Sequence, residues 1–235
     1  MKLILEEIKK SFDNKEVLKG ASFIFEKGCI YGLLGRNGAG KTTLFNCLNE
    51  DIGIDSGKFE IEEGERRRAV SDEDIGYVLS IPVVPEFLTG REFLKFFVDI
   101  NKDNIRDEKT LDEYFDLIRL ERDDRDRLIK DYSHGMKTKM QMLVNFIANP
   151  GIFLLDEPLT SFDVVVADEM KELLRHMKSD HIIILSTHIM ELALDLCDEI
   201  VILNHGILKK IENDSGDKTA FKNQIIAALK GEEDD

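Results

Sequence analysis

The stretch YGLLGRNGAGKTTLFNCL, residues 31–48, joins a short apolar run to a helical pattern through glycines, a lysine and two threonines. From Gly35 to Thr42 it fits the pattern G-x-x-x-x-G-K-[ST] in full. Glycines let backbone amides turn inward around a phosphate, and the helix that follows presents the positive end of its dipole. A chance glycine-rich turn is the alternative, but the strand expected before the loop and the helix expected after it favour a phosphate-binding loop.

The polar residues of this loop have separate expected roles. Lys41 is predicted to reach the β- and γ-phosphate oxygens, and the Thr42 hydroxyl is predicted to bind Mg2+. The residues predicted to bind nucleotide here are Gly35, Asn37, Gly38, Ala39, Gly40, Lys41, Thr42 and Thr43.

Two adjacent carboxylates that could serve the metal and the attacking water are expected at the end of the apolar run IFLLDEP, residues 152–158. Asp156 is predicted to hold Mg2+ through water, and Glu157 is predicted to act as the general base that polarises the attacking water. A carboxylate pair at a strand end also occurs as a helix cap or a surface turn. The presence of Lys41 in the phosphate loop favours the catalytic interpretation.

Composition limits the possible partners. The net charge of −15 argues against a general affinity for nucleic acid, whose phosphates select basic stripes. The basic run ERRR, residues 65–68, is expected to be a solvated turn. Cys29, Cys47 and Cys197 are far apart and flanked by apolar residues, which predicts buried structural thiols in a reducing compartment.

No apolar run reaches the 18 or so residues that span a bilayer, and the start MKLILEEIKK turns acidic too early for a signal peptide. We therefore expect the protein to stay in the cytoplasm.

The order of patterns along the chain indicates an α/β fold. Residues 1–30 read as three short strand segments with a turn at Asp13 and Asn14, and IYGLL reads as a strand buried on both faces. Buried strand patterns return as IFLLDEP, HIIILST and EIVILNHG, with helical patterns between them. This alternation predicts a parallel sheet with crossover helices.

The segment between these two groups of strands has a different, helical character. Residues 91–100 and 111–120 carry apolar residues at helical spacing, and a third helix is expected before Asn149 and Pro150, with a stripe of methionines that fills a core. A last helix is expected over residues 217–229, followed by an acidic tail.

At this point the chain resembles the ATP-binding cassettes of ABC transporters over roughly residues 1–210. That family carries a signature loop close to L-S-G-G-Q ahead of a helix, and this chain has YSHGM, residues 132–136, in that place. The resemblance assigns Ser133 and the amide of Gly135 to an anion site at a helix N-terminus. In the family this site serves the γ-phosphate held by the other subunit.

Other motifs follow in the family's order. Phe12 matches the aromatic residue that stacks on adenine, with a plain core phenylalanine as the alternative. The segment TSFD, residues 160–163, stands where the family has its interface loop S-G-L-D. His188 in LSTH matches the switch histidine that hydrogen-bonds the γ-phosphate and orients the attacking water, with a structural histidine as the alternative.

The chain departs from the family pattern at three places. Ser80 stands where the family has a glutamine that reaches Mg2+ and the attacking water, and its shorter side chain implies a bridging water, a dispensable glutamine or slow hydrolysis. His134 replaces the first signature glycine. Phe162 and Val164 replace a leucine and a proline of the interface loop.

Together the patterns and the resemblance predict a P-loop NTPase with a RecA-like parallel sheet core, an N-terminal antiparallel β subdomain and an inserted α-helical subdomain. We expect the catalytic core over residues 1–88 and 150–210, and the helical subdomain with the signature loop over 89–149. A short C-terminal extension with an acidic tail is expected over 211–235.

The resemblance implies ATP and Mg2+ as cofactors, a second cassette as partner in a face-to-face dimer, and no nucleic acid. It also implies a separate membrane permease that places the chain at the inner face of the cell membrane. Val83, Val84, Phe87 and Leu88 are predicted to line the permease-docking groove, with ordinary lobe packing as the alternative. The form of the signature and the lack of an added regulatory domain favour export over import.

Two other functions remain open from the sequence. The first is a regulatory cassette that binds ATP and dimerises with little turnover, which Ser80 makes conceivable. The second is a non-transport ATPase of the same family that acts on ribosomes or DNA. That class has tandem cassettes or a long coiled coil between the nucleotide motifs, and this chain shows neither.

Overall fold

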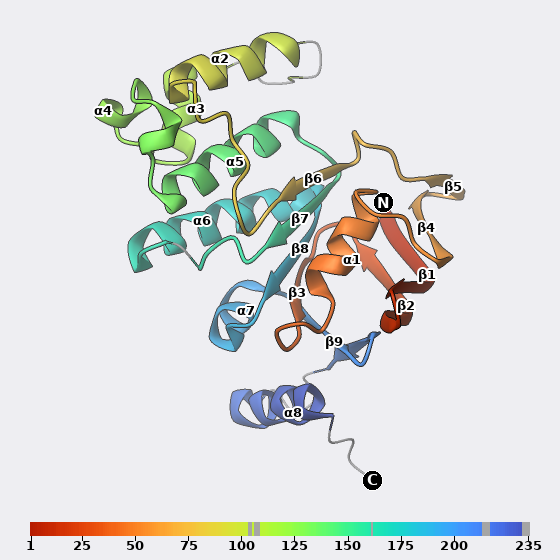
Figure 1. Ribbon diagram of the computed structural model, residues 1–235. Coiled ribbons are helices and arrows are strands. Elements are labelled where there is room, and N and C mark those ends of the chain that lie inside the picture. Colours follow the sequence, from red (N-terminus) through yellow and green to blue (C-terminus); the bar gives the residue numbers. More distant parts are fainter. Residues whose placement is uncertain (103–104, 106–108, 161, 213–216, 232–235) are drawn as a thin grey trace.

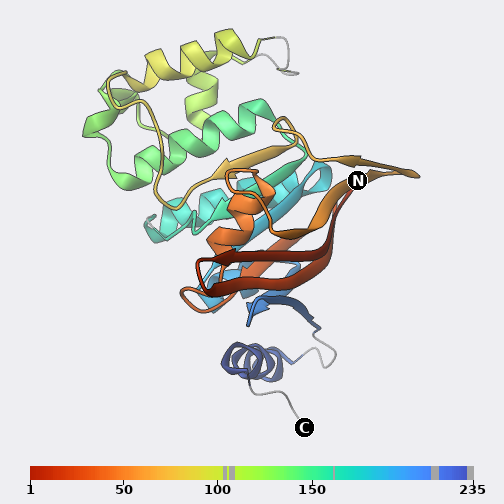
Figure 2. The ribbon, with the colours of Figure 1, turned by 45° about the vertical axis from the view of Figure 1, so that its right-hand side comes forward.

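Two β-sheets face each other across helix α1 (Lys41–Leu48), as Figures 1 and 2 show from two sides. The computed structural model describes residues 1–102, 105, 109–160, 162–212 and 217–231. The strands are β1 (Lys2–Phe12), β2 (Lys15–Glu26), β3 (Ile30–Leu34), β4 (Ser56–Glu63), β5 (Arg66–Ala69), β6 (Ile75–Val78), β7 (Ile152–Asp156), β8 (Ile182–Thr187), β9 (Glu199–Asn204) and β10 (Ile207–Ile211). The other helices are α2 (Gly90–Ile100), α3 (Leu111–Leu117), α4 (Arg122–Arg125), α5 (His134–Ala148), α6 (Val164–Met177), α7 (Met190–Leu196) and α8 (Lys218–Lys230).

The larger sheet has the strand order β10-β9-β3-β8-β7-β6 in the described part of the chain. Its neighbours pair in parallel from β9 to β6, and β10 adds an antiparallel edge. β3, β7 and β8 are buried along their whole length because helices and the second sheet cover their two faces. The parallel sheet predicted from the apolar runs is confirmed.

The smaller sheet is antiparallel and has the order β2-β1-β4-β5. The three short N-terminal strand segments predicted from the sequence are in fact two long strands joined by the turn at Asp13 and Asn14. β2 continues through Gly20, which adopts a left-handed φ of 108°, and the β1–β2 register shifts at bulges on either side. The glycine absorbs the irregularity, so the strand does not end there.

Residues 65–68 are solvent-exposed as predicted, but the prediction that the whole run is a turn is wrong. The turn takes only Gly64 and Glu65, and the arginines that follow form the edge strand β5. Its register places Arg67 opposite Glu62 and Arg66 opposite Glu63, so opposite charges face each other across the hairpin. The acidic run before the turn supplies the partners that make the basic run a strand.

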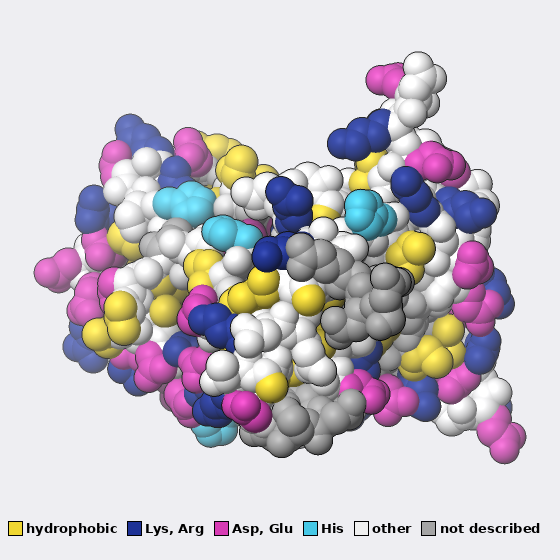
Figure 3. Space-filling model, turned by 90° about the horizontal axis from the view of Figure 1, so that it is seen from below, with side chains coloured by type: hydrophobic (Ala, Val, Ile, Leu, Met, Phe, Trp, Pro, Cys, Tyr) yellow, Lys and Arg dark blue, Asp and Glu magenta, His cyan; other side chains and the backbone are white. Residues whose placement is uncertain are grey.

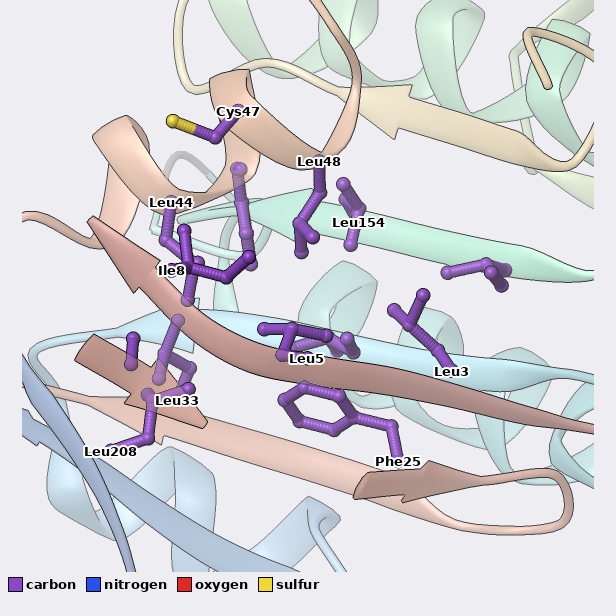
Figure 4. Packing of buried hydrophobic residues seen from close by; sticks show 14 of the residues in the cluster. Leu3, Leu5, Ile8, Phe25, Leu33, Leu44, Cys47, Leu48, Leu154 and Leu208 are labelled. Atoms are coloured by element: carbon purple, nitrogen blue, oxygen red, sulfur yellow. The ribbon is translucent and has the colours of Figure 1, made fainter. Parts of the chain in front are cut away.

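The main core lies between the two sheets and around α1. Figure 4 shows Leu44 and Leu48 of α1 facing Leu154 of β7 and Ile8 of β1. These side chains are 0–1% exposed. Burial of this face fixes α1, and therefore the loop that precedes it, against the carboxyl ends of β3 and β7.

A separate helical lobe lies beyond β6 and contains α2 to α5 (Figure 1). Thr89 and Thr110 begin α2 and α3 with capping boxes, which explains why these helices start where they do. Leu94, Phe115 and Leu143 fill the core of the lobe. The helical lobe predicted between the strand groups is present, and its boundaries at 89 and 149 stay a prediction.

Two details of the lobe differ from the sequence pattern. Ile100, expected on the apolar stripe of α2, is 63% exposed at the end of that helix. In α5, Met140 faces the lobe core while Met142 packs against β7 and β8, so both sides of α5 are covered. The methionines act as core residues, as the sequence indicated.

The predicted C-terminal helix is α8, which packs Ile225 against β9 and α7. The acidic tail at residues 232–235 lies outside the described residues. Cys47 is buried as predicted, whereas Cys29 and Cys197 are only half-buried. None of the helices in the described ranges has the length and apolar character needed to cross a bilayer.

Candidate nucleotide-binding site

A pocket of about 880 Å3 lies where the phosphate loop meets the turn between β1 and β2. Its size lies within the range of pockets that bind nucleotide-sized ligands. It is lined by Phe12, Asp13, Asn14, Lys15, Val17, Asn37, Gly38, Ala39, Gly40, Lys41, Thr42, Thr43, Ser80, Asp156 and Glu157. The structure therefore brings together most residues that the sequence predicted for ATP and Mg2+.

Two glycines give the phosphate loop its shape. Gly38 and Gly40 adopt φ angles of 79° and 107°, which L residues with a side chain rarely adopt. A Cβ atom on Gly40 would also lie 2.8 Å from Cγ1 of Val17 on β2. Helix α1 begins directly after Gly40, so its first amides point into the pocket region.

Lys41 is the buried cation of the pocket and is only 8% exposed. Its ammonium donates a hydrogen bond of 2.8 Å to the carbonyl oxygen of Gly35. Burial lowers the pKa of Lys41, and the nearby carboxylates of Glu157 and Asp156 act in the opposite direction. Gly35 itself does not line the pocket and contributes through this bond.

Thr42 and Asp156 lie together although 114 positions separate them in the sequence. The Thr42 hydroxyl donates a hydrogen bond of 2.8 Å to Oδ2 of Asp156, and Asp156 is almost wholly buried at the end of β7. A hydroxyl and a carboxylate at one spot are oxygen ligands of the kind Mg2+ prefers. The donor set therefore fits Mg2+, which the Thr42 hydroxyl and the Asp156 carboxylate would hold.

No cluster of three or more His, Cys, Asp or Glu side chains suited to a metal ion occurs within the part of the chain that the structure describes.

The second carboxylate of the site, that of Glu157, is in contact with His188. Nδ1 of His188 lies 2.8 Å from Oε1 of Glu157, and the Thr187 hydroxyl lies 3.4 Å from Oε2. The backbone of Glu157 has a φ of 52°, a left-handed conformation that is uncommon for a residue with a side chain. His188 is not among the pocket-lining residues and reaches the site through Glu157.

Phe12 ends β1 and is 46% exposed at the pocket, which does not fit the alternative of a core phenylalanine. The ammonium of Lys10 lies 5.3 Å from the centre of its ring. Stacking of Phe12 on adenine stays a prediction.

The signature residues lie outside this pocket. Ser133 precedes α5, and its hydroxyl accepts a hydrogen bond of 3.2 Å from the amide of Met136, so it caps its own helix. Gly135 lies in the first turn of α5 and is half-buried. One chain thus carries a phosphate loop and a signature loop that do not meet.

In the predicted interface loop, Asp163 caps α6 by accepting bonds from the amides of Val165 and Val166. Val164 beside it is 87% exposed. Ser161 of the same loop lies outside the described residues.

Several pocket residues were not predicted from the sequence. Asp13, Asn14, Lys15 and Val17 line the pocket because β2 folds back along β1. Ser186, which hydrogen-bonds Asp156, was also missed. The available signal was its place, two residues before His188 at the polar end of a buried strand. Ser80, predicted at the metal, is exposed and lines the same pocket.

Known proteins are similar to this chain in sequence and in fold. The family model "ABC transporter" matches residues 18–160, more than half of the chain. An uncharacterized ABC transporter ATP-binding protein of Methanocaldococcus jannaschii is 34% identical over 209 residues, which cover 87% of this chain and 75% of that protein. The lantibiotic transport ATP-binding protein SrtF of Streptococcus pyogenes is 28% identical over 230 residues, covering 95% of this chain and 97% of that protein.

A longer relative and a solved structure complete the comparison. The match to human ATP-binding cassette sub-family A member 6, at 33% identity, covers 87% of this chain and only 13% of that protein. The solved structure of an ATP-binding subunit of an ABC transporter superposes with a TM-score of 0.77 at 24% identity, covering 98% of this chain and 95% of that one. The predicted fold class is confirmed, and the chain belongs to the ABC transporter family as one of its nucleotide-binding cassettes.

Proposed function

We propose that this chain binds ATP with Mg2+ and hydrolyses it in a face-to-face dimer of cassettes, which drives transport through a separate membrane permease. The observation that carries the proposal is the pairing of Thr42 with Asp156 at 2.8 Å, beside the Glu157–His188 pair, at one end of a pocket lined by the phosphate loop. The arrangement contains a lysine for the phosphates, a hydroxyl and a carboxylate for the metal, and a second carboxylate that can accept a proton.

The chain's own residues divide the work as follows. The amides of residues 38–42 and the Lys41 ammonium hold the phosphates, and Thr42 with Asp156 holds the metal. Mg2+, when bound, neutralises charge that develops on the phosphate oxygens. Glu157 accepts the proton of the attacking water, and His188 keeps the Glu157 carboxylate turned toward it.

The dimer is proposed because the signature loop of one chain does not meet its own phosphate loop. Ser133 and Gly135 lie at the N-terminus of α5, outside the pocket formed by the phosphate loop. In a twofold arrangement they complete the site of the partner, and the exposed Val164 becomes part of the contact. ATP then shifts the population toward the closed dimer.

Gel filtration of a Glu157→Gln variant tests the dimer, because this variant binds ATP without consuming it. We expect a dimer with ATP and Mg2+ and a monomer without nucleotide. The matched control is the double variant Glu157→Gln with Lys41→Ala, which should stay monomeric with ATP. A Glu157→Gln protein that stays monomeric under all nucleotide conditions contradicts the proposal.

The permease-docking surface is proposed at the segment before α2. Val83 and Phe87 are 70% and 80% exposed, whereas Val84 packs against the lobe core. Two exposed apolar side chains in one short segment fit a contact with a partner, and Val84 instead follows the lobe-packing alternative. This contact would hold the chain at the inner face of the membrane.

Replacing Phe87 with Asp should reduce transport in reconstituted vesicles while ATP hydrolysis by the isolated chain stays unchanged. Phe96→Asp is the matched control, because Phe96 is also an exposed phenylalanine, 58% exposed on α2. Equal transport by the Phe87→Asp variant and the wild type would contradict the docking surface. Unfolding of Phe87→Asp alone would point to lobe packing instead.

Export rather than import is proposed from two relatives whose names state export or lantibiotic transport. These are SrtF and the Nod factor export ATP-binding protein I of a Rhizobium strain, which is 34% identical over 206 residues. Nucleic acid is not a proposed partner. Figure 3 shows acidic and basic side chains interspersed on the visible face without a continuous basic stripe.

A regulatory cassette with little turnover is the second candidate, favoured by Ser80 at the pocket where the family has a longer glutamine. A phosphate-release assay on the purified chain separates the two, with Glu157→Gln as the inactive control. Turnover well above that control supports the transport ATPase, and equal rates support the regulatory cassette.

A further inference from the structure

The end of β8 carries a hydroxyl that belongs to none of the nucleotide motifs. Ser186 is wholly buried and pairs in register with Asp156 across the parallel strands β7 and β8. Ile184, two residues earlier on the same face of β8, belongs to the core between the sheets. Ser186 is therefore a polar residue on an otherwise apolar face of β8, at the end of the strand that lies beside the nucleotide site.

The Ser186 hydroxyl donates a hydrogen bond to Oδ1 of Asp156. The other oxygen of the same carboxylate, Oδ2, accepts the hydrogen bond of 2.8 Å from Thr42. Both oxygens of Asp156 are thus directed by hydroxyl groups, one on the phosphate loop and one on β8. Because each donor holds a different oxygen, the two bonds together fix the orientation of the carboxylate.

This contact matters because the terminal torsion of an aspartate is broad and its plane is weakly set by its own rotamer. Partners behind a metal ligand orient it, and their loss typically lowers metal affinity about 10- to 100-fold. Asp156 is 2% exposed, so water cannot readily replace a lost donor at Oδ1.

We propose that Ser186 is a positioning residue for the metal site, which holds Asp156 with Oδ2 turned toward Thr42 and the metal position. The inference rests on the proposed role of Asp156 in binding Mg2+. It assigns to the end of β8 a function in metal affinity that is separate from the contact of His188 with Glu157.

The test uses the full chain in a Glu157→Gln background, where nucleotide is not consumed. ATP affinity is measured by calorimetry once with EDTA and once with saturating Mg2+. The dissociation constant with EDTA divided by the dissociation constant with Mg2+ gives a ratio that reports how strongly the bound complex holds the metal. We expect Ser186→Ala to reduce this ratio about 10-fold. Its affinity for metal-free ATP should stay close to that of the background protein.

Two further variants separate positioning from a general loss of packing. Ser186→Thr keeps the hydroxyl and should restore most of the ratio. Ile184→Val removes a buried methyl group from the same face of β8 and should leave the ratio unchanged while lowering thermal stability. If Ser186→Ala does not fold, Ser186→Cys takes its place, because a thiol has similar size and is a weak donor.

The outcomes are distinct. A ratio that is unchanged in Ser186→Ala, or that falls equally in Ile184→Val, overturns the positioning role while the proposed function stands. A background protein that binds ATP equally well with and without Mg2+, or not at all, overturns the proposed metal site and the role of Ser186 with it.

Discussion

Nδ1 of His188 lies 2.8 Å from Oε1 of Glu157, at the carboxyl ends of the neighbouring strands β8 and β7. His188 follows its strand in an exposed bend, and Glu157 has a left-handed backbone. The contact holds the half-buried Glu157 carboxylate at the pocket that the phosphate loop lines.

Replacing His188 with Ala should lower kcat for ATP hydrolysis about 100- to 1000-fold, since a misplaced general base loses most of its effect. The affinity for ATP should change little because His188 does not line the pocket. Phosphate release and calorimetry measure the two quantities. His176→Ala on the exposed face of α6 is the control, and loss of ATP binding in His188→Ala would argue for a structural role instead.

Asp74 should make the free energy of unfolding decrease at acid pH. Its carboxylate accepts bonds of 2.6 and 2.7 Å from Arg68 and two more from Ser71, and these hold its pKa at about 2. Because the folded-state pKa lies below the unfolded value, this stabilisation is complete above about pH 4 and is lost as the pH falls toward 2.

Asp74→Asn should therefore lower the free energy of unfolding by about 1 kcal/mol at neutral pH, a value discounted for the solvent around Arg68. Urea unfolding from pH 7 to pH 2 measures the difference, which should vanish at the acid end. The exposed Asp72→Asn serves as the control. A difference that does not depend on pH would show that the carboxylate charge is not the cause.

Arg125 should stabilise the helical lobe more than the rest of the molecule. It is 3% exposed, donates to the carbonyl of Leu120 and to Asp112 at 3.0 Å each, and lies over the ring of Phe115. Arg125→Ala should cost about 2–3 kcal/mol, less than for a fully buried ion pair, because the carboxylates left behind remain in contact with water.

Hydrogen exchange resolves where that loss occurs. Amides of α2 to α5 should exchange faster in Arg125→Ala, while those of β3, β7 and β8 keep most of their protection. Arg66→Ala on the exposed edge strand β5 is the control. Equal loss of protection in the lobe and the sheet would show that the two parts unfold as one unit.

The cysteines should react slowly in the folded protein. Burial raises the pKa of the Cys47 and Cys29 thiols to about 11, so few thiolates exist at pH 8. Iodoacetamide labelling followed by mass spectrometry should modify buried Cys47 more slowly than half-buried Cys29. All three cysteines should react readily in urea, and fast labelling of native Cys47 would contradict the packing of α1.

The sequence predicted the local features of this fold well. The phosphate loop is one contiguous segment, and the buried strands are continuous apolar runs, so both are readable without knowledge of their neighbours. Residues 66–68 were mistaken for a turn because their strand character depends on pairing with β4, where Arg66 and Arg67 face glutamates. The exposed place of Ile100 likewise depends on where α2 leaves the lobe.

What the sequence alone determined was the set of chemical groups: a loop shaped for phosphate, two adjacent carboxylates, and a histidine at a strand end. Only the tertiary structure decided that Thr42 meets one oxygen of Asp156 while Ser186 meets the other, and that β2 closes the pocket beside Phe12. The physical reason is that these contacts join residues far apart in the chain. Their distances are set by strand order and register in the two sheets, which no local pattern encodes.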